Sequence, residues 1–221
     1  MKKALLAFLS GAWILGGLPC DADAAFINYA AREINCKIVY YGSATAGLHD
    51  NLVYIYGKTN PESRGKMIAL KTETDNVEFF DFLPLNLGEI RGFKVRFHLY
   101  TVPGNSAYDT SRVLILKGVD GVVFVADSDP ARLNETLASW KSLKKNLAQD
   151  GFDWRTIPLV VQLDHRDRPD AMSVEQLKQA LGITTQPTFE AVVPTGVGVF
   201  ATLKGIARLI LIALRDGAAA R

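Results

Sequence analysis

The sequence has few of the residues that build metal sites, disulfide frameworks or nucleic-acid surfaces. Its only cysteines, Cys20 and Cys36, show neither CxxC spacing nor a neighbouring histidine cluster, which argues against zinc, haem attachment and a disulfide framework. Lys and Arg total 25 against 23 Asp and Glu, so the chain lacks the basic excess that nucleic-acid binding requires. We therefore expect no metal-ligand cluster and no nucleic-acid partner.

Apolar residues are abundant, at 48% of the 221 residues. This is enough to form one buried core, and the length fits a single domain preceded by a targeting segment. Disorder is therefore not expected, and no internal repeat or low-complexity linker interrupts the chain.

Residues 1–24 have the three parts of a secretory signal peptide. Two lysines precede an apolar run over residues 4–18, and the small-residue pattern Ala-Asp-Ala follows at 22–24. We expect cleavage after Ala24 and an exported, periplasmic protein. Three alternatives stay open: an uncleaved membrane anchor, a lipoprotein modified at Cys20, and a cytoplasmic protein whose start is mis-assigned.

From residue 25 to about residue 217, short apolar runs alternate with segments of helical periodicity, and residues 218–221 form a tail. This alternation predicts an α/β fold with a three-layer, mostly parallel sheet and an antiparallel edge hairpin that turns at "NLGEIRG", residues 86–92. Further strands are expected at 34–42, 118–128, 157–164 and 188–195, and helices at 50–59, 106–117, 130–149, 173–181 and 198–215.

Ligands of such sheets bind beyond the carboxyl ends of the strands, so the loops there are the candidate site. In "GSATAG" the spacing of Gly42 and Gly47 is that of the phosphate-binding motif GxxxxGK[ST], although Leu48 and His49 stand where Lys and Ser or Thr belong. Three later loops occupy the places of the DxxG, NKxD and purine-facing loops of GTPases. They are "TVPGN" (101–105), "LDHRD" (163–167) and "VPTGVG" (193–198).

Four longer stretches also resemble a known family: "FINYAAREINCKIVYYG", "FFDFLPLNLGEIRGFKVRFHLYTVPG", "LILKGVDGVVFVADS" and "PTGVGVF". Over residues 26–217 the chain resembles the bacterial MglA family of Ras-like small GTPases, the gliding-motility and cell-polarity switches. The resemblance implies a Ras-like P-loop NTPase fold with an extra edge strand. It also implies GTP and magnesium as ligands, and a Roadblock-fold MglB partner that accelerates hydrolysis.

The chain departs from that family where the resemblance places charge and metal coordination. The lysine that holds the β- and γ-phosphates falls on Leu48, and the magnesium-binding hydroxyl falls on His49. The switch arginine falls on Asn76, the switch threonine on Val77, and the water-orienting glutamine on Asn105. No catalytic residue is assigned, because Asn76 and Asn105 stand at degenerate positions.

The base-reading loop departs in the same way, because its Asn-Lys pair falls on Asp164 and His165. Residues that shape the backbone or face the base are kept. The resulting vestigial nucleotide site comprises Gly42, Ser43, Gly47, Leu48, His49, Asp50, Thr101, Gly104, Asp164, His165, Asp167, Thr195 and Gly196.

Asp50 adds a negative charge to the first turn of the helix after the glycine loop, where free amides would otherwise receive a phosphate. One hypothesis is that Asp50, together with His49, fills the phosphate site from within. The alternative is an ordinary helix-start acid that points to solvent.

Two functions are compatible with these replacements. The first is a catalytically inactive pseudo-GTPase without cofactor, which acts as a protein-interaction module. Its contact surface would be the hairpin at 82–97 with the switch segments 72–80 and 104–112, and its partner could be MglB-like. The second is a functional MglA-type switch with weak or altered binding of GTP, GDP and magnesium. A membrane is a partner only if the N-terminal segment stays uncleaved.

Overall fold

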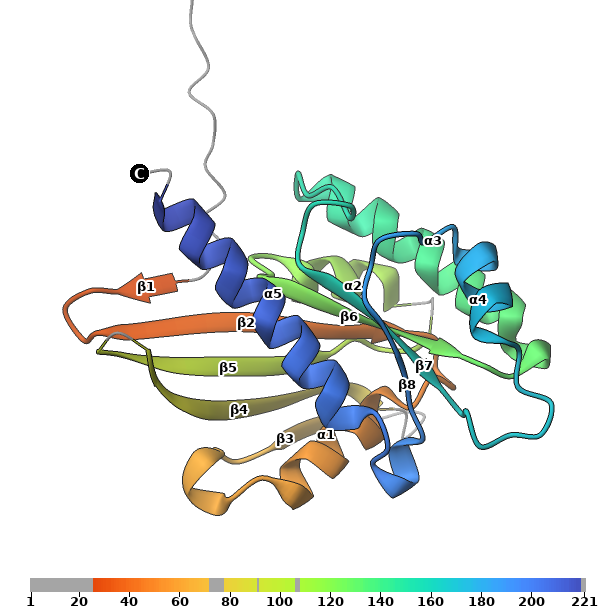
Figure 1. Cartoon of the computed structure of the whole chain (residues 1–221), viewed down its shortest axis with the longest axis horizontal. Coiled ribbons are helices and arrows are strands. Elements are labelled where there is room, and N and C mark those ends of the chain that lie inside the picture. The colour runs from red at the N-terminus through yellow and green to blue at the C-terminus, as the bar shows by residue number, and fades with distance from the viewer. Residues whose placement is uncertain (1–25, 72–77, 91, 106–107, 220–221) are drawn as a thin grey trace, which may run out of the picture.

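The computed structural model describes residues 26–71, 78–90, 92–105 and 108–219. These residues form one mixed β-sheet with helices on both faces (Figure 1). The expected signal segment and the switch positions Asn76 and Val77 lie outside the described residues. Among the helices that the structure describes, none combines the length and apolar character needed to cross a membrane.

The sheet has eight strands in the order β3-β4-β5-β2-β6-β7-β8, and β1 also pairs with β2. Strands β5, β2, β6, β7 and β8 are mutually parallel, whereas β1, β3 and β4 pair antiparallel. The predicted α/β class, with its antiparallel edge, is therefore confirmed. The strands are β1 (Phe26–Asn28), β2 (Glu33–Gly42), β3 (Ile68–Lys71), β4 (Glu78–Ile90), β5 (Phe93–Thr101), β6 (Gly121–Asp127), β7 (Leu159–Asp164) and β8 (Thr188–Glu190).

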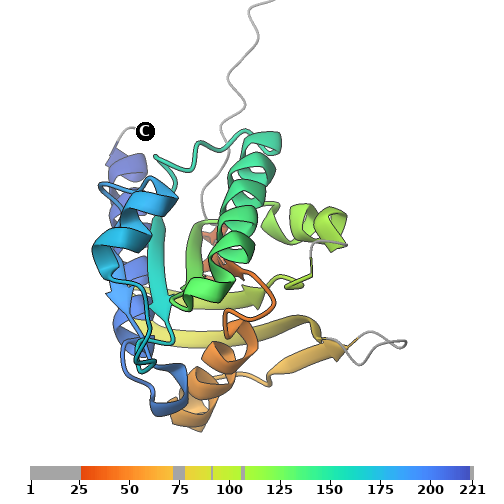
Figure 2. The ribbon, with the colours of Figure 1, turned by 90° about the vertical axis from the view of Figure 1, so that its right-hand side faces the viewer.

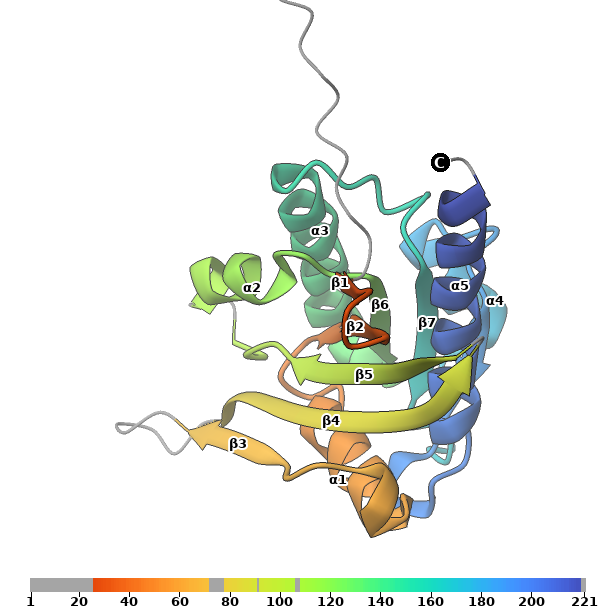
Figure 3. The same cartoon turned by 90° about the vertical axis from the view of Figure 1, so that its left-hand side faces the viewer.

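Helices cover both faces of the sheet, so the molecule has three layers. Figure 3 shows α2 and α3 on one side and α1 and α5 on the other, and α4 packs beside α3. The α-helices are α1 (Leu48–Lys58), α2 (Asp109–Leu116), α3 (Leu133–Gln149), α4 (Val174–Leu181) and α5 (Val199–Ala219). Short 3₁₀ helices are η1 (Pro61–Ser63), η3 (Pro130–Arg132) and η4 (Val193–Thr195).

The burial of the strands follows from their place in the sheet. All seven residues of β6 are buried, because this central strand has helices over both faces. In β5, the buried residues Val95, Phe97 and Leu99 alternate with Lys94 and Arg96, which are exposed. The continuous apolar run of β6 and the alternation of β5 were both visible in the sequence.

The edge hairpin differs from its predicted form. A turn was expected over residues 86–92, but β4 continues to Ile90, which pairs with Phe93. The pairing changes register between Asn86 and Glu89, and Gly88 there has a φ of 91° that favours glycine. Gly88, which the sequence pattern assigned to the turn, therefore lies in a β-bulge within β4.

The C-terminal third also differs in detail. Strand β8 ends at Glu190 instead of residue 195, because residues 193–195 form the 3₁₀ helix η4 around Pro194, which has no N–H for a strand ladder. Helix α5 continues to Ala219, beyond the expected end at residue 215. Strand β1 was not predicted from the residue pattern; it pairs with β2 over three residues.

Candidate functional site

A cavity of about 370 Å³ lies at the edge of the sheet where the parallel strands β2 and β5 end, the side that faces the viewer in Figure 2. Its walls come from the glycine loop and the start of α1, from β4, and from the loops after β5 and β7. The lining residues are Ser43, Ala44, Thr45, Gly47, Leu48, His49, Asp50, Asp81, Thr101, Val102, Gly104, Asn105 and His165.

The glycine loop turns directly into α1. Gly47 has φ 66° and ψ 30°, a left-handed conformation that glycine adopts without strain, and the helix begins at the next residue. Gly47 has no side chain that could cap the first turn of the helix. The cavity wall therefore includes a helix N-terminus of the kind that binds anions.

The charges near this helix start do not favour a phosphate. Leu48, where the resemblance places the phosphate-binding lysine, is 7% exposed and belongs to the hydrophobic core. Asp50 is exposed in the first turn and lines the cavity, and none of the described lining residues is Lys or Arg. The hypothesis that Asp50 fills the phosphate site stays a prediction.

His49 contacts a buried carboxylate on the neighbouring strand β4. Its Nδ1 lies 3.0 Å from Oδ2 and 3.1 Å from Oδ1 of Asp81, which is 1% exposed. Thr101 completes the group, because its hydroxyl accepts the Asp81 N–H at 2.7 Å and donates to Asp81 Oδ2 at 3.2 Å. His49, where the resemblance places the magnesium-binding hydroxyl, is thus linked directly to β4 and, through Asp81, to β5.

The loop after β5 packs tightly against the glycine loop. A Cβ added to Gly104 would lie 2.3 Å from Ala44 Cα, so only glycine fits there. The buried guanidinium of Arg112, on α2, donates from Nε to the Pro103 carbonyl at 2.8 Å and from Nη2 to the Gly104 carbonyl. Asn105 follows at an exposed position on the cavity wall.

Asp164 joins three loops beneath the cavity. Its Oδ1 accepts the Val193 N–H at 3.2 Å, and a Cβ on Gly47 would lie 2.7 Å from its Oδ2. Burial raises the pKa of this carboxyl above its usual range, with hydrogen bonds from His165 and Val193 opposing the effect. Asp164 thus holds the loops together as an acceptor, at the position where the resemblance places Asn.

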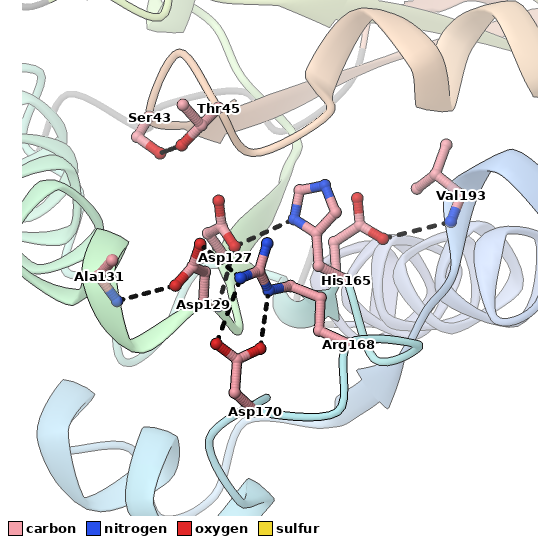
Figure 4. A network of polar contacts seen from close by, with 10 residues as sticks. Ser43, Thr45, Asp127, Asp129, Ala131, His165, Arg168, Asp170 and Val193 are labelled. Carbon is pink, nitrogen blue, oxygen red and sulfur yellow. Dashed lines mark hydrogen bonds and ion pairs between the residues drawn. The ribbon is translucent and has the colours of Figure 1, made fainter.

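His165 points from the loop after β7 toward the end of β6. Its Nδ1 lies 3.0 Å from Oδ1 of the buried Asp127, and Figure 4 shows the ring directed at that carboxylate. A φ of 59° gives this residue a left-handed backbone. Arg168 lies beside it, between Asp129 and Asp170 (Figure 4), with contacts of 3.2 and 3.1 Å.

The purine-facing residues lie outside the cavity wall. Asp167 is exposed in the loop after β7. Thr195 ends η4, and its carbonyl accepts the Tyr54 hydroxyl at 3.3 Å. Gly196 has φ 82°, and a Cβ there would collide with the Tyr54 ring. Tyr54 of α1 therefore packs so closely against this loop that only glycine fits at position 196.

The structure brings together most of the predicted site. Nine predicted residues line the cavity: Ser43, Gly47, Leu48, His49, Asp50, Thr101, Gly104, Asn105 and His165. Gly42, Asp164, Asp167, Thr195 and Gly196 do not line it, and Asn76 lies outside the described residues. Sequence reasoning missed Asp81. A single acid inside the apolar run "FFDFLPL" was the signal that could have revealed it.

Comparison with known proteins identifies the family. The chain is 58% identical over 193 residues to the mutual gliding-motility protein MglA of Myxococcus xanthus (strain DK1622). The aligned residues make up 87% of this chain and 99% of that protein. The chain belongs to the MglA family of small GTPases. No protein-family model matches the chain. The sheet of this MglA-family protein is consistent with the Ras-like fold that the resemblance implied.

The described residues of this MglA-family chain do not fit the magnesium ion that the family implies. Mg²⁺ prefers oxygen ligands in octahedral geometry. Here an imidazole stands at the hydroxyl position, and the Asp81 carboxylate beside it already accepts hydrogen bonds from His49 and Thr101. The cavity itself is within the roughly 300–1,000 Å³ range of small-molecule sites.

Proposed function

We propose that this protein is an MglA-type switch protein that binds a guanine nucleotide weakly, hydrolyses GTP inefficiently and acts through a protein partner. The observation that carries this proposal is the cavity at the carboxyl ends of β2 and β5. It keeps the helix N-terminus of a phosphate site, but Leu48 is buried and His49 is bound to Asp81.

Nucleotide binding is supported by the backbone features that need no charged side chain. The Gly47 turn presents the first amides of α1 to the cavity. Gly104 approaches Ala44 closely, as a loop following the phosphates requires. Asp167, Thr195 and Gly196 remain in the loops that would meet a guanine base.

Weak affinity follows from the lost charges. A charge-assisted hydrogen bond to phosphate contributes roughly 1.5–3 kcal/mol. The absence of both the lysine and the metal anchor therefore reduces binding by about 3–6 kcal/mol, or roughly a hundred- to ten-thousand-fold.

Slow hydrolysis follows from a second set of replacements. An arginine that stabilises the transition state contributes about 10³ to 10⁵ in rate. In this chain Asn76 stands at the arginine position, and Asn105, one methylene shorter than Gln, stands where the attacking water would be oriented. Magnesium coordination is also replaced at His49, so three contributions to catalysis are weakened together.

Calorimetric titration of the full chain with GDP and GTP tests this proposal. We expect dissociation constants weaker than about 1 µM, which corresponds to about −8 kcal/mol, and GTP turnover slower than about 10⁻⁴ per second. Tighter binding or faster turnover would contradict it.

A stricter alternative is a pseudo-GTPase that takes no nucleotide at all and serves as an interaction scaffold. The exposed carboxylate of Asp50 at the helix start favours this alternative, because it repels a phosphate. The same titration separates the two, since the scaffold would give no heat with GDP at millimolar concentration.

The proposed partner surface is the hairpin at 82–97 together with the switch segments 72–80 and 104–112. Ile90 in the hairpin is 40% exposed, and further exposed apolar side chains lie on the elements next to these segments. Ile68 and Leu70 are 45% and 47% exposed on the edge strand β3, and Leu114 on α2 is 58% exposed. A Roadblock-fold protein of the MglB kind is the candidate partner. Ile90→Asp in the hairpin and Leu114→Asp directly beyond the second switch segment should each abolish its co-elution with the full chain in gel filtration. Binding that survives both changes would exclude this surface.

We further propose that the signal-like segment at 1–24 directs export to the periplasm and is cleaved after Ala24. The support is the order of charged, apolar and small residues in the sequence. Fractionation of cells and mass spectrometry of the recovered protein test it. A periplasmic chain beginning at Ala25 is expected, and a full-length cytosolic chain would contradict export.

A further inference from the structure

We propose that the His49–Asp81 pair takes the place of a divalent cation, so that the cavity binds its ligand without metal. This inference rests on the proposed weak nucleotide binding. It concerns the inner wall of the cavity, where the first turn of α1 meets β4 and β5.

The acceptor atoms on this wall are already engaged. Asp81 is 1% exposed, and both its carboxylate oxygens lie within 3.1 Å of His49 Nδ1. The Thr101 hydroxyl donates to the same carboxylate and accepts the Asp81 N–H. The three side chains are thus linked by hydrogen bonds centred on Asp81.

The direction of the His49 bond follows from chemistry. An ionised carboxylate has only acceptor atoms, so the Nδ1 of His49 must carry the hydrogen. This bond is available whether or not the ring carries a second proton. The donor therefore satisfies a buried carboxylate that would be costly to bury without a hydrogen-bond partner.

A magnesium ion would have to break this group to reach Asp81. The ion would meet the imidazole nitrogen of His49 where it prefers an oxygen ligand. It would also have to lose bound water, which Mg²⁺ does reluctantly. Breaking the pair would also remove the bonds of Asp81 to the half-buried His49 ring and to the buried Thr101 hydroxyl, which is costly. Hydrogen bonds from the protein, and not a cation, therefore hold the Asp81 carboxylate in place.

His165 offers a matched control. Its Nδ1 also lies 3.0 Å from a buried carboxylate, that of Asp127, and its side chain also lines the cavity. It belongs to the loop after β7 and not to α1. Comparing variants at the two positions therefore separates the effect of losing any histidine–aspartate bond in the cavity from the effect of losing the His49–Asp81 bond.

The test is titration of the full chain with GDP in magnesium chloride and in EDTA, for the natural protein, His49→Thr and His165→Asn. Asn is chosen at 165 because it tolerates a left-handed backbone. For the natural protein, and separately for His165→Asn, the affinity for GDP should be the same in magnesium chloride as in EDTA, within about twofold. His49→Thr should bind at least about tenfold tighter with magnesium, because a hydroxyl and the freed carboxylate then face the ion.

Magnesium dependence in the natural protein, or none in His49→Thr, would overturn the inference. If GDP binds in neither medium, the proposed function fails, and a second measurement then decides the inference alone. Nitrogen-15 NMR of the histidine rings in the full chain reports the tautomer of His49. Millimolar magnesium should leave its Nδ1–H signal unchanged; a shift there, with His165 unaffected, would overturn the inference.

Discussion

The backbone N–H of Val193 donates to the Asp164 carboxylate at 3.2 Å, linking two loops that are 29 residues apart in the chain. The other oxygen of that carboxylate lies against Gly47, so one side chain supports three loops of the site. Asp and Asn both offer an acceptor oxygen, but only Asn has an amide N–H. Compared with the Asn that the resemblance implies here, Asp164 keeps the acceptor that links the loops and lacks the amide donor.

Asp164→Asn should stabilise the protein near neutral pH. The amide keeps the acceptor for Val193 and avoids burying a charge, and we expect about 1 kcal/mol, or roughly 2–4 °C in Tm. The gain should depend on pH. Burial holds the pKa of Asp164 in the folded state above its unfolded value, so the natural protein loses stability as pH rises between the two.

The difference between the two proteins should therefore shrink below about pH 4, where Asp164 is protonated in both states. Thermal unfolding from acid to neutral pH measures this. Asp164→Ala is the control: it leaves the Val193 N–H without an acceptor and should cost roughly 1–3 kcal/mol. A pH-independent difference for Asp164→Asn would show that its charge is not what matters.

The double change Leu48→Lys with His49→Thr should restore nucleotide affinity. It returns a phosphate-binding ammonium and a hydroxyl to the start of α1, and together these contribute about 3–6 kcal/mol. Calorimetry with GDP and magnesium should show a gain of roughly a hundred- to ten-thousand-fold.

Leu48→Met is the matched control, because it keeps the volume of the buried side chain without adding charge. It should not change GDP binding. A double variant that unfolds at the temperature of the natural protein, yet gains no affinity, would refute the assignment of these two positions.

Asp50→Asn should strengthen binding of GDP or sulfate by about two- to fivefold. An exposed charge at a helix start contributes roughly 0.3–1 kcal/mol, and here it opposes an incoming anion. Glu175→Gln removes the corresponding first-turn acid of α4, away from the cavity, and should leave binding unchanged. Equal behaviour of the two variants would mean that Asp50 only points to solvent.

Arg112→Met should destabilise the fold by about 3 kcal/mol, because the carbonyls of Pro103 and Gly104 lose a charged donor in a buried setting. Lys145→Met removes an exposed cation, 3.6 Å from Asp109, and should cost less than about 1 kcal/mol.

Urea denaturation gives both stabilities, and hydrogen exchange at Gly104 reports the loop itself. Exchange should be faster only in Arg112→Met. Equal stability losses in the two variants would show that the carbonyl bonds of Arg112 contribute little.

Several elements were predictable because their sequence periods reflect burial. The all-buried β6 appears as an unbroken apolar run, and β5 appears as an alternation. The path of β4 past residue 86 was not predictable, because Gly88 lies in a β-bulge and a glycine in a bulge has the same local sequence pattern as one in a turn. Pro194 shortened β8 through a 3₁₀ turn that propensity alone did not indicate.

The amino-acid sequence by itself predicted the fold class, the order of the central strands and of the helices, and the positions of the site loops, but not the short strand β1. It did so because hydrophobic period and glycine spacing are local properties of the chain. Only the tertiary structure decided what the replaced residues do. Asp81 is 32 residues from His49, and it reaches the metal position because sheet pairing sets β4 beside β5. That contact depends on the register of the sheet, which no local pattern in the sequence specifies.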